Sequence, residues 1–472
     1  MVRKILSLLL LLCLLIPMTV ACGDKESEKE SGGESVLVQG DDVPRDDAPT
    51  PIMDDFGGYE FRVLSRSGSL ASDDITGELG GAKMSNATYR RNVTLKDKYN
   101  FEIVEYKEAD PKKIAQTTGA AGEYAYDMWA IRMADVPALA TEGYLYDLNE
   151  VDEINLEASY YDERTIDAVS FAERLFFVTG DMLYMDDLAI SCMVFNTKLW
   201  NDLQLDNVYQ KSLYQLVESG EWTFEALKKL AISGIKDLNG DGVYDSTDQW
   251  GCAYANGDIF AMTVALGDPV LQKDADDIFY LNKTDKLVTD LTDIFTFFNS
   301  PSCIKDLTYM NGTVLFKYLP MNNLANVVSP GSVPYGVIPA PKYDETAEYY
   351  SYVSGHSANC ITICSAVPDV DKTANIIELI SYESQTTNVP VFAEYLFSDV
   401  YAHEDDVKMV EILKETRAYE NAYVWSIGSI YNTLIELNQA GGMGIAHTLQ
   451  VCESSVNSSV KTKLKAIRAL DY

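Results

Sequence analysis

The chain has 472 residues, too many for one ordinary hydrophobic core, so we expect at least two domains. Hydrophobic residues make up 47% and charged residues 23%, the balance of a globular protein. The formal net charge of −35 argues against a nucleic-acid partner: such a surface repels phosphate, and Lys and Arg never stand in runs longer than pairs such as Arg90–Arg91.

The first 21 residues have the pattern of a secretory signal peptide. Two cations, Arg3 and Lys4, precede an apolar run over residues 5–16, which is short for a membrane span. The segment ends in Thr-Val-Ala-Cys at Cys22, which resembles the lipobox of bacterial lipoproteins, where the cysteine becomes the lipidated N-terminus. We therefore expect a lipid anchor at Cys22, on the extracellular face of the cell membrane. The alternative is an ordinary secretory signal followed by an incidental cysteine.

Residues 22–55 are rich in Gly, Ser, Pro and acidic side chains and poor in apolar ones. Such a segment cannot bury enough surface to fold, so we expect a flexible, acidic tether between the anchor and the folded body.

The folded body begins near Phe56 with alternating strands and helices. Apolar runs predict strands over residues 59–65, 100–107 and 126–132, and helical patterns follow over 84–98 and 133–142. This alternation is typical of a parallel, doubly wound sheet.

A second α/β region starts after the apolar run 189–196. Thr223 is placed to cap a helix whose apolar face begins at Phe224. Further strands are predicted over residues 333–344 and within 350–367. A helix follows near 372–384, and the pattern is mostly helical from Asp405 onward.

The cysteines beyond Cys22 show no zinc-binding spacing. They are Cys192, Cys252, Cys303, Cys360, Cys364 and Cys452. We expect most of these cysteines to be buried thiols; the alternative is that two of them form one disulfide.

Residues 237–248 read D-x-N-x-D-G-x-x-D-x-x-D, the spacing of a calcium-binding loop. Oxygen side chains stand at positions one, three, five, nine and twelve, Gly242 permits the turn, and position seven offers a carbonyl. The candidate ligands of a structural calcium are Asp237, Asn239, Asp241, Val243, Asp245 and Asp248. The alternative is an Asx-rich turn stabilised by its own side chains.

Several segments occur in the order found in the sugar-binding family 1 of extracellular solute-binding proteins of ABC importers. They are YRRNVTLKDKYNFEI, YDMWAIRMADVPALATEGYLYDLNEV, MVFNTKLW, SGEWTFEALKKLA and YGVIPAPKYD. The resemblance implies a two-lobe, hinge-linked α/β fold of the periplasmic-binding-protein type (type II) with its ligand between the lobes. Lobe one would hold residues 56–186 and about 355–400, and lobe two 187–354; the helical region 401–472 matches least, so its lobe assignment stays open.

Ligands of open α/β sheets bind beyond the carboxyl ends of strands. Applied to the predicted strands and crossings, this rule selects aromatic side chains for sugar faces and polar ones for hydroxyls. The candidate ligand-binding residues are Arg66, Ser67, Trp129, Arg132, Asp186, Asp187, His356 and Trp425. Each tryptophan has the alternative of a core position, and Arg132 and Asp187 that of an ion pair.

The sequence therefore predicts a monomeric, lipid-anchored receptor without catalytic residues, which binds a carbohydrate, expected to be an oligosaccharide, and delivers it to an ABC permease. Two alternatives remain: a secreted carbohydrate-active hydrolase that uses paired carboxylates, and a surface adhesin. The aromatic content favours a sugar, although amino acid, polyamine and peptide ligands stay open.

Overall fold

The computed structural model describes residues 48–68, 70–305, 312–324, 334–396 and 403–470. Cys22, the predicted signal peptide 1–21 and most of the predicted tether lie outside this part, so these predictions remain predictions. Thr50 and Ile52 do lie within it, and both form backbone hydrogen bonds with the Asn375 side chain, at 2.9 and 3.1 Å. None of the described helices combines the length and the apolar character needed to cross a membrane.

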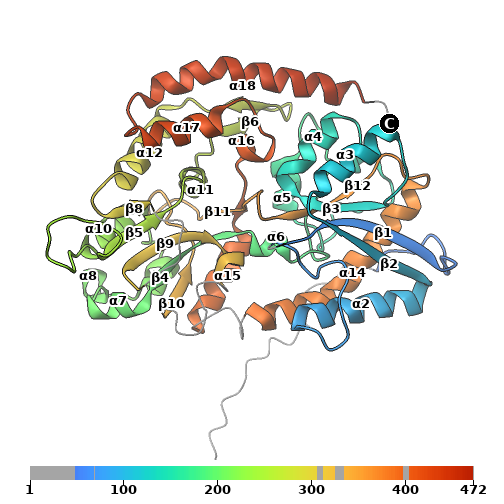
Figure 1. Ribbon diagram of the computed structural model, residues 1–472, viewed down its shortest axis with the longest axis horizontal. Helices are drawn as coiled ribbons and strands as arrows, with labels where there is room; N and C mark the ends of the chain where they lie inside the picture. The colour runs from blue at the N-terminus through green and yellow to red at the C-terminus, as the bar shows by residue number, and fades with distance from the viewer. Residues whose placement is uncertain (1–47, 69, 306–311, 325–333, 397–402, 471–472) are drawn as a thin grey trace, which may run out of the picture. The chain divides into compact units, whose positions relative to one another are not determined.

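A four-stranded sheet with the order β12-β3-β1-β2 forms the centre of what we call lobe one (Figure 1). Its strands are β1 (Tyr59–Arg66), β2 (Phe101–Glu108), β3 (Met128–Arg132) and β12 (Asn359–Ile363). The β1 strand pairs in parallel with β2 and β3, as the alternating pattern predicts, whereas β12 is antiparallel to β3. Its helices are α2 (Lys83–Tyr99), α3 (Pro111–Ala121), α4 (Val136–Thr141), α5 (Glu163–Val169), α6 (Met185–Leu188) and α14 (Val370–Tyr395), with short 3-10 turns at Met133–Asp135 and Leu148–Glu150.

A five-stranded sheet with the order β10-β4-β9-β5-β8 forms the centre of lobe two. Its strands are β4 (Ser191–Asn196), β5 (Trp250–Tyr254), β8 (Cys303–Lys305), β9 (Val314–Pro320) and β10 (Tyr335–Ile338). The β5 strand is parallel to β8 and β9, and β4 is antiparallel to β9 and β10. Its helices are α7 (Thr197–Asp202), α8 (Asp206–Tyr209), α9 (Leu213–Glu218), α10 (Phe224–Ser233), α11 (Asp258–Ala265) and α12 (Asp285–Phe298), with a 3-10 turn at Met321–Asn323. Both sheets are mixed, because strands that follow a crossing between the lobes enter in the opposite direction.

The α10 helix illustrates how local signals set these elements. The Thr223 side chain accepts a hydrogen bond from the Ala226 amide at 3.3 Å and so caps the helix, as predicted. Phe224, Leu227 and Ala231 are buried on one face.

The C-terminal region is helical, as predicted, and touches both lobes. It comprises α15 (Asp405–Glu415), β13 (Arg417–Ala418), α16 (Asn421–Val424), α17 (Ile430–Gln439) and α18 (Ile445–Arg468). Helix α15 packs on β10, whereas α18 contacts α12 and α4, which belong to different lobes (Figure 1, red). A hairpin of β6 (Leu271–Lys273) and β7 (Phe279–Leu281) also lies against α18.

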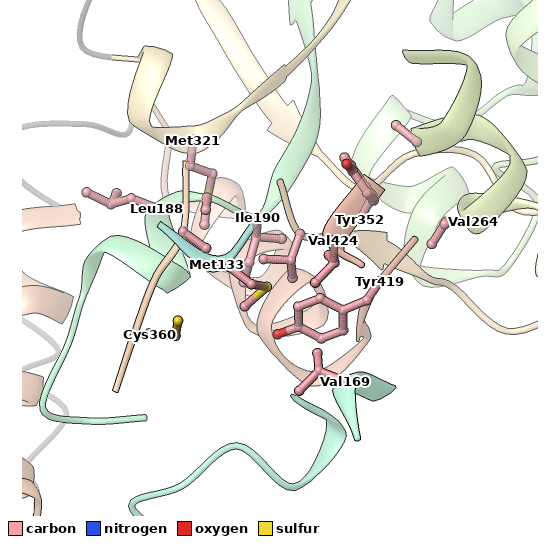
Figure 2. Close-up of a cluster of buried hydrophobic side chains, with 14 of the residues drawn as sticks. Met133, Val169, Leu188, Ile190, Val264, Met321, Tyr352, Cys360, Tyr419 and Val424 are labelled. Carbon is pink, nitrogen blue, oxygen red and sulfur yellow. The ribbon is translucent and has the colours of Figure 1, made fainter. Parts of the chain in front are cut away.

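Three segments run side by side where the lobes join. β11 (Ser351–Tyr352) pairs with β13, and the Ser354 amide donates to the Ala189 carbonyl at 2.9 Å. Buried side chains from both lobes and from these crossings surround them (Figure 2), among them Met133, Ile190 and Met321. The lobes therefore share a continuous hydrophobic core at their junction.

The six described cysteines beyond Cys22 are all buried free thiols, which confirms the expectation for these residues.

Candidate functional site

A cavity of about 210 Å³ lies beside the crossing segments. Four tyrosines line it, together with Asp258, His356 and the small residues Ser191 and Ser354; the tyrosines are Tyr318, Tyr352, Tyr423 and Tyr431. Tyr318 lies at the carboxyl end of β9, and Asp258 begins the helix that follows the parallel strand β5. The cavity thus occupies the position where open α/β sheets bind ligands.

The tyrosines of the C-terminal region form an aromatic wall. The Tyr431 ring stacks on Phe260, with ring centroids 4.3 Å apart and planes inclined by 18°. Tyr423 packs against Tyr431 at 4.9 Å and 50°. Both are half-buried, so each ring keeps part of its surface for a ligand.

Asp258 supplies a carboxyl group to this cavity. Its Oδ2 accepts a hydrogen bond from the Ala255 amide at 2.7 Å. Burial raises the pKa of Asp258 to about 7, against the opposing effects of that hydrogen bond and of Lys317. The group can therefore accept or donate a hydrogen bond to a hydroxyl near neutral pH.

His356 lies on the cavity wall contributed by the crossing to lobe one. Its Nδ1 is 3.2 Å from Nη1 of Arg132 and 3.4 Å from the Tyr423 hydroxyl. Because arginine can only donate, Nδ1 accepts and Nε2 carries the proton of the neutral ring. Burial and the positive charges of Arg132 and Arg66 lower the pKa of His356.

Three of the predicted ligand-binding residues meet at this wall: Arg66, Arg132 and His356. Arg66 donates from Nη1 to the His356 carbonyl at 3.1 Å, and Arg132 contacts the His356 ring. Of the three, only His356 lines the cavity itself. Ser67 is half-buried after β1, where its amide donates to the Glu108 carbonyl at 2.8 Å, and it is not among the residues that line the cavity.

The assignment of Trp129 and Trp425 to the ligand site is wrong, since both side chains are 0% exposed. Trp129 lies within β3, whose residues are buried except at the end. The Trp425 Nε1 donates to the Val169 carbonyl at 3.0 Å, and its ring packs edge-on against Phe171. Both are core residues.

Asp186 and Asp187 form ion pairs with the C-terminal region and are not among the residues that line this cavity. Asp187 accepts from Arg417 Nη2 at 2.8 Å and from Lys414 at 2.7 Å, and Asp186 lies 3.5 Å from the same guanidinium. Asp186, Asp187 and Arg417 are buried, whereas the Lys414 side chain is 36% exposed, and these ion pairs hold the C-terminal region to the crossing.

Sequence reasoning missed the four lining tyrosines and Asp258. Asp258 had a usable signal, because it follows a parallel strand of lobe two, where the same positional rule applies. Tyr423 and Tyr431 had none, since only the packing of the C-terminal region brings them to this edge.

The predicted calcium ligands lie in one turn beyond α10. Asp237 accepts from the amides of Gly240 and Gly242, at 2.7 and 2.9 Å, and Gly242 has a φ of 78°. The side chains of Asn239, Asp241 and Asp245 each accept from an amide two residues further on, and the fully buried Asp248 accepts from Leu238 and Asp245. In this conformation the carboxylates face backbone amides, and no cluster of three metal-ligating side chains occurs in the described residues. The calcium site stays a prediction.

No protein-family model matches the chain, and no curated protein matches it. Solved structures do match, at low sequence identity. The cyclic α-maltosyl-1,6-maltose-binding protein of Arthrobacter globiformis aligns over 86% of this chain and 100% of its own, with a TM-score of 0.55 and 13% identity. The galacto-N-biose/lacto-N-biose I-binding protein of a Bifidobacterium longum ABC transporter aligns over 87% and 99%, with 0.55 and 12%.

An ABC substrate-binding protein of Listeria monocytogenes in complex with cycloalternan aligns over 86% of this chain and 99% of its own, with a TM-score of 0.54 and 12% identity. These alignments span nearly the whole of each neighbour and both lobes of this chain. The chain therefore has the two-domain α/β fold of periplasmic binding proteins, as the sequence predicted.

Proposed function

We propose that the protein is the substrate-binding component of an ABC transporter and that it binds a carbohydrate in the cavity between its lobes. The observation that carries this proposal is the cavity of about 210 Å³, where four tyrosines, one carboxyl group and one imidazole meet at the crossings. The fold supports it, because the structural neighbours include proteins in complex with cycloalternan and lacto-N-biose.

The chemistry of the lining suits a sugar. A pyranose ring has an apolar face that packs on aromatic side chains, and Tyr423 and Tyr431 offer such surfaces. Its hydroxyls both donate and accept, as do Asp258 near neutral pH and the Ser191 hydroxyl. On the basis of the sequence pattern, we further propose that Cys22 carries a lipid anchor outside the cell and that the protein delivers its sugar to a permease.

The hydrolase alternative fits the cavity less well. Glycosidases use two carboxyl groups about 5–10 Å apart across the scissile bond. Among the described residues that line the cavity, Asp258 alone carries a carboxyl group. A binding role without turnover is therefore the better-supported proposal.

A thermal-shift screen of purified protein against oligosaccharides tests the proposal. Binding at a hundred times the dissociation constant stabilises the folded state by about 2.7 kcal/mol, a readily measured rise in melting temperature. The same samples are analysed by chromatography, and the sugar should be recovered intact. No shift with any saccharide, or consumption of the sugar, would refute the proposal.

The Tyr431→Ala variant should bind the saccharide found in this screen about tenfold more weakly or worse. Removing a central aromatic surface costs about 1.4 kcal/mol or more of binding free energy. Isothermal titration calorimetry measures the change. Tyr280→Ala, which truncates a tyrosine that is 41% exposed and lies outside the cavity, is the matched control and should bind normally. Equal affinities in both variants would remove Tyr431 from the site.

We propose in addition that residues 237–248 bind a structural calcium ion. The spacing of the oxygen side chains and the positive φ of Gly242 support this. Adding a calcium chelator should lower the melting temperature of the protein, and excess calcium should restore it. Asp241→Asn should abolish this response. A melting temperature that does not depend on calcium would leave the segment as an Asx-rich turn.

A further inference from the structure

The lobe-one wall of the cavity carries an excess of positive charge, although the whole chain has a net charge of −35. Arg132, 34% exposed at its side chain, forms a two-point ion pair with Asp135, in which both N–O distances are 2.8 Å. Lys112 approaches the same carboxylate at 3.7 Å. Arg132 and Lys112 therefore share the single negative charge of Asp135.

Arg66 adds a buried cation without an ion pair to any described carboxylate. Its guanidinium donates to the carbonyls of Leu70, at 3.1 Å, of His356, at 3.1 Å, and of Ser357. Burial, and then the charge of Arg132, lowers the pKa of Arg66 to about 10, so the group remains cationic at neutral pH.

Two further acidic residues nearby, Asp110 and Asp74, do not neutralise this excess of positive charge. Asp110 caps α3 by accepting from the Lys113 amide at 3.2 Å, and Asp74 accepts from the Tyr184 amide at 3.0 Å, close to Arg91. Each therefore has a role of its own, although both act on this wall at longer range. The positive charges of Arg132 and Arg66 act on the imidazole of His356, which lines the cavity. After burial, these charges are the next causes that lower its pKa.

The opposite wall differs in character. There Asp258 and Tyr318 come from lobe two, and Asp258 is the one carboxyl group among the described lining residues. Its raised pKa, about 7, leaves it partly protonated near neutral pH, so it suits a hydroxyl. A ligand that spans the cavity thus meets Asp258 on one side and, on the other, His356 with Arg132 and Arg66 behind it.

We propose that the ligand is an acidic saccharide whose carboxylate, as in a uronic acid, lies at the His356–Arg132 wall while its neutral hydroxyls face Asp258 and the tyrosines. This inference rests on the proposed carbohydrate-binding function and assigns its substrate class. The donor that lines the cavity is the Nε2–H of His356. A carboxylate bound there lies beside the guanidinium of Arg132, which contacts the His356 ring and is 34% exposed. Charge-assisted hydrogen bonds of this kind are roughly twice as strong as neutral ones.

Calorimetric titration of the full chain with paired saccharides tests the inference. Each acidic trisaccharide, built from galacturonate, glucuronate or mannuronate, is compared with its neutral counterpart of the same stereochemistry. We expect at least one acidic saccharide to bind tenfold tighter or better than its neutral partner. Because salt screens the attraction between charges, this preference should shrink as the salt concentration rises from about 50 to about 500 mM.

Arg132→Gln should abolish the preference for the acidic saccharide over its neutral partner. Arg132→Lys, which keeps the charge, should retain most of it, and Arg164→Gln, on the exposed surface of α5, should change nothing. Should Arg132→Gln fail to fold, the salt dependence and Arg132→Lys still decide the question. Binding of neutral saccharides without a preference for any acid would overturn this inference and leave the proposed function intact, whereas failure to bind any saccharide would overturn both.

Discussion

Arg417→Leu is expected to lower the free energy of unfolding by about 3–5 kcal/mol, because it removes the central cation from a buried group of carboxylates. The guanidinium pairs with Asp162 and with Asp187 and lies 3.5 Å from Asp186. Burial, then the neighbouring charge of Asp187, raises the pKa of Asp186. Without Arg417, Asp162 and Asp186 would lose this cation, whereas Asp187 would keep its ion pair with Lys414.

Equilibrium unfolding in urea measures this effect as a shift of the transition midpoint. Arg417→Lys keeps one charge and should lose less stability, although an ammonium cannot reproduce the forked contacts of the guanidinium. Arg164→Leu, at an exposed position on α5, is the control and should stay within about 0.5 kcal/mol of the parent. A loss below about 1 kcal/mol for Arg417→Leu would mean that the ion pairs do not hold the junction.

The parts of the fold that the sequence predicted correctly are those with local causes. Thr223 caps α10 in the structure because the capping hydrogen bond spans three residues, and such a signal is visible in a short window. The alternation of apolar runs and helices likewise predicted the parallel pairing of β1 with β2. The antiparallel entry of β12 depends on a crossing hundreds of residues later, which local patterns do not encode.

The assignment of Trp129 failed because both faces of the first sheet are covered. The β3 strand is buried at four successive positions, so its sequence shows no alternation that would mark a ligand-facing side. The ion pairs of the aspartates could not be predicted for a different reason: the partner of Asp187 is Arg417, 230 positions further along the chain. A carboxylate near a predicted hinge looks the same in sequence whether a ligand or a distant arginine pairs with it.

The positional rule for open sheets selected charged residues that the structure brings together at one edge of the lobe-one sheet. Arg66 and Arg132 end β1 and β3, and the parallel pairing of these strands places their carboxyl ends at one edge, beside His356. The same rule, applied to β5, would have selected Asp258. What it could not supply is the aromatic wall, because Tyr423 and Tyr431 reach the cavity only through the fold of the C-terminal region.

The melting temperature of the ligand-free protein should fall as the pH rises from 5.5 to 8. Asp258 and Glu420 are both buried, and burial raises the pKa of each to about 7. For Glu420, burial outweighs three backbone amides that hydrogen-bond to its carboxylate, those of Val270, Leu271 and Ala422.

The sign follows from proton binding. In the unfolded chain these carboxyls have pKa values near 4, so between about pH 4 and 7 the folded state holds more protons than the unfolded state. Stability therefore falls as the pH rises through this window, and the loss is complete above about pH 7. Between pH 5.5 and 8 each group contributes on the order of 2 kcal/mol. The lowered pKa of Asp187 acts below this range.

His356 opposes this trend, because its lowered pKa makes protonation easier in the unfolded chain, so that acid destabilises the fold below about pH 6.5. Its ring is exposed, which keeps that contribution smaller than those of two buried carboxyls.

Calorimetric or circular-dichroism melting at constant ionic strength, from pH 5.5 to 8, gives the profile. Asp258→Asn retains an oxygen for the Ala255 amide but cannot titrate, so it should flatten the slope by the share that Asp258 contributes. The rest of the slope belongs to Glu420 and to Asp181, whose pKa burial also raises to about 7. A melting temperature that rises with pH would contradict the raised pKa values of the buried carboxyls. A slope unchanged in Asp258→Asn would show that Asp258 does not titrate in this range.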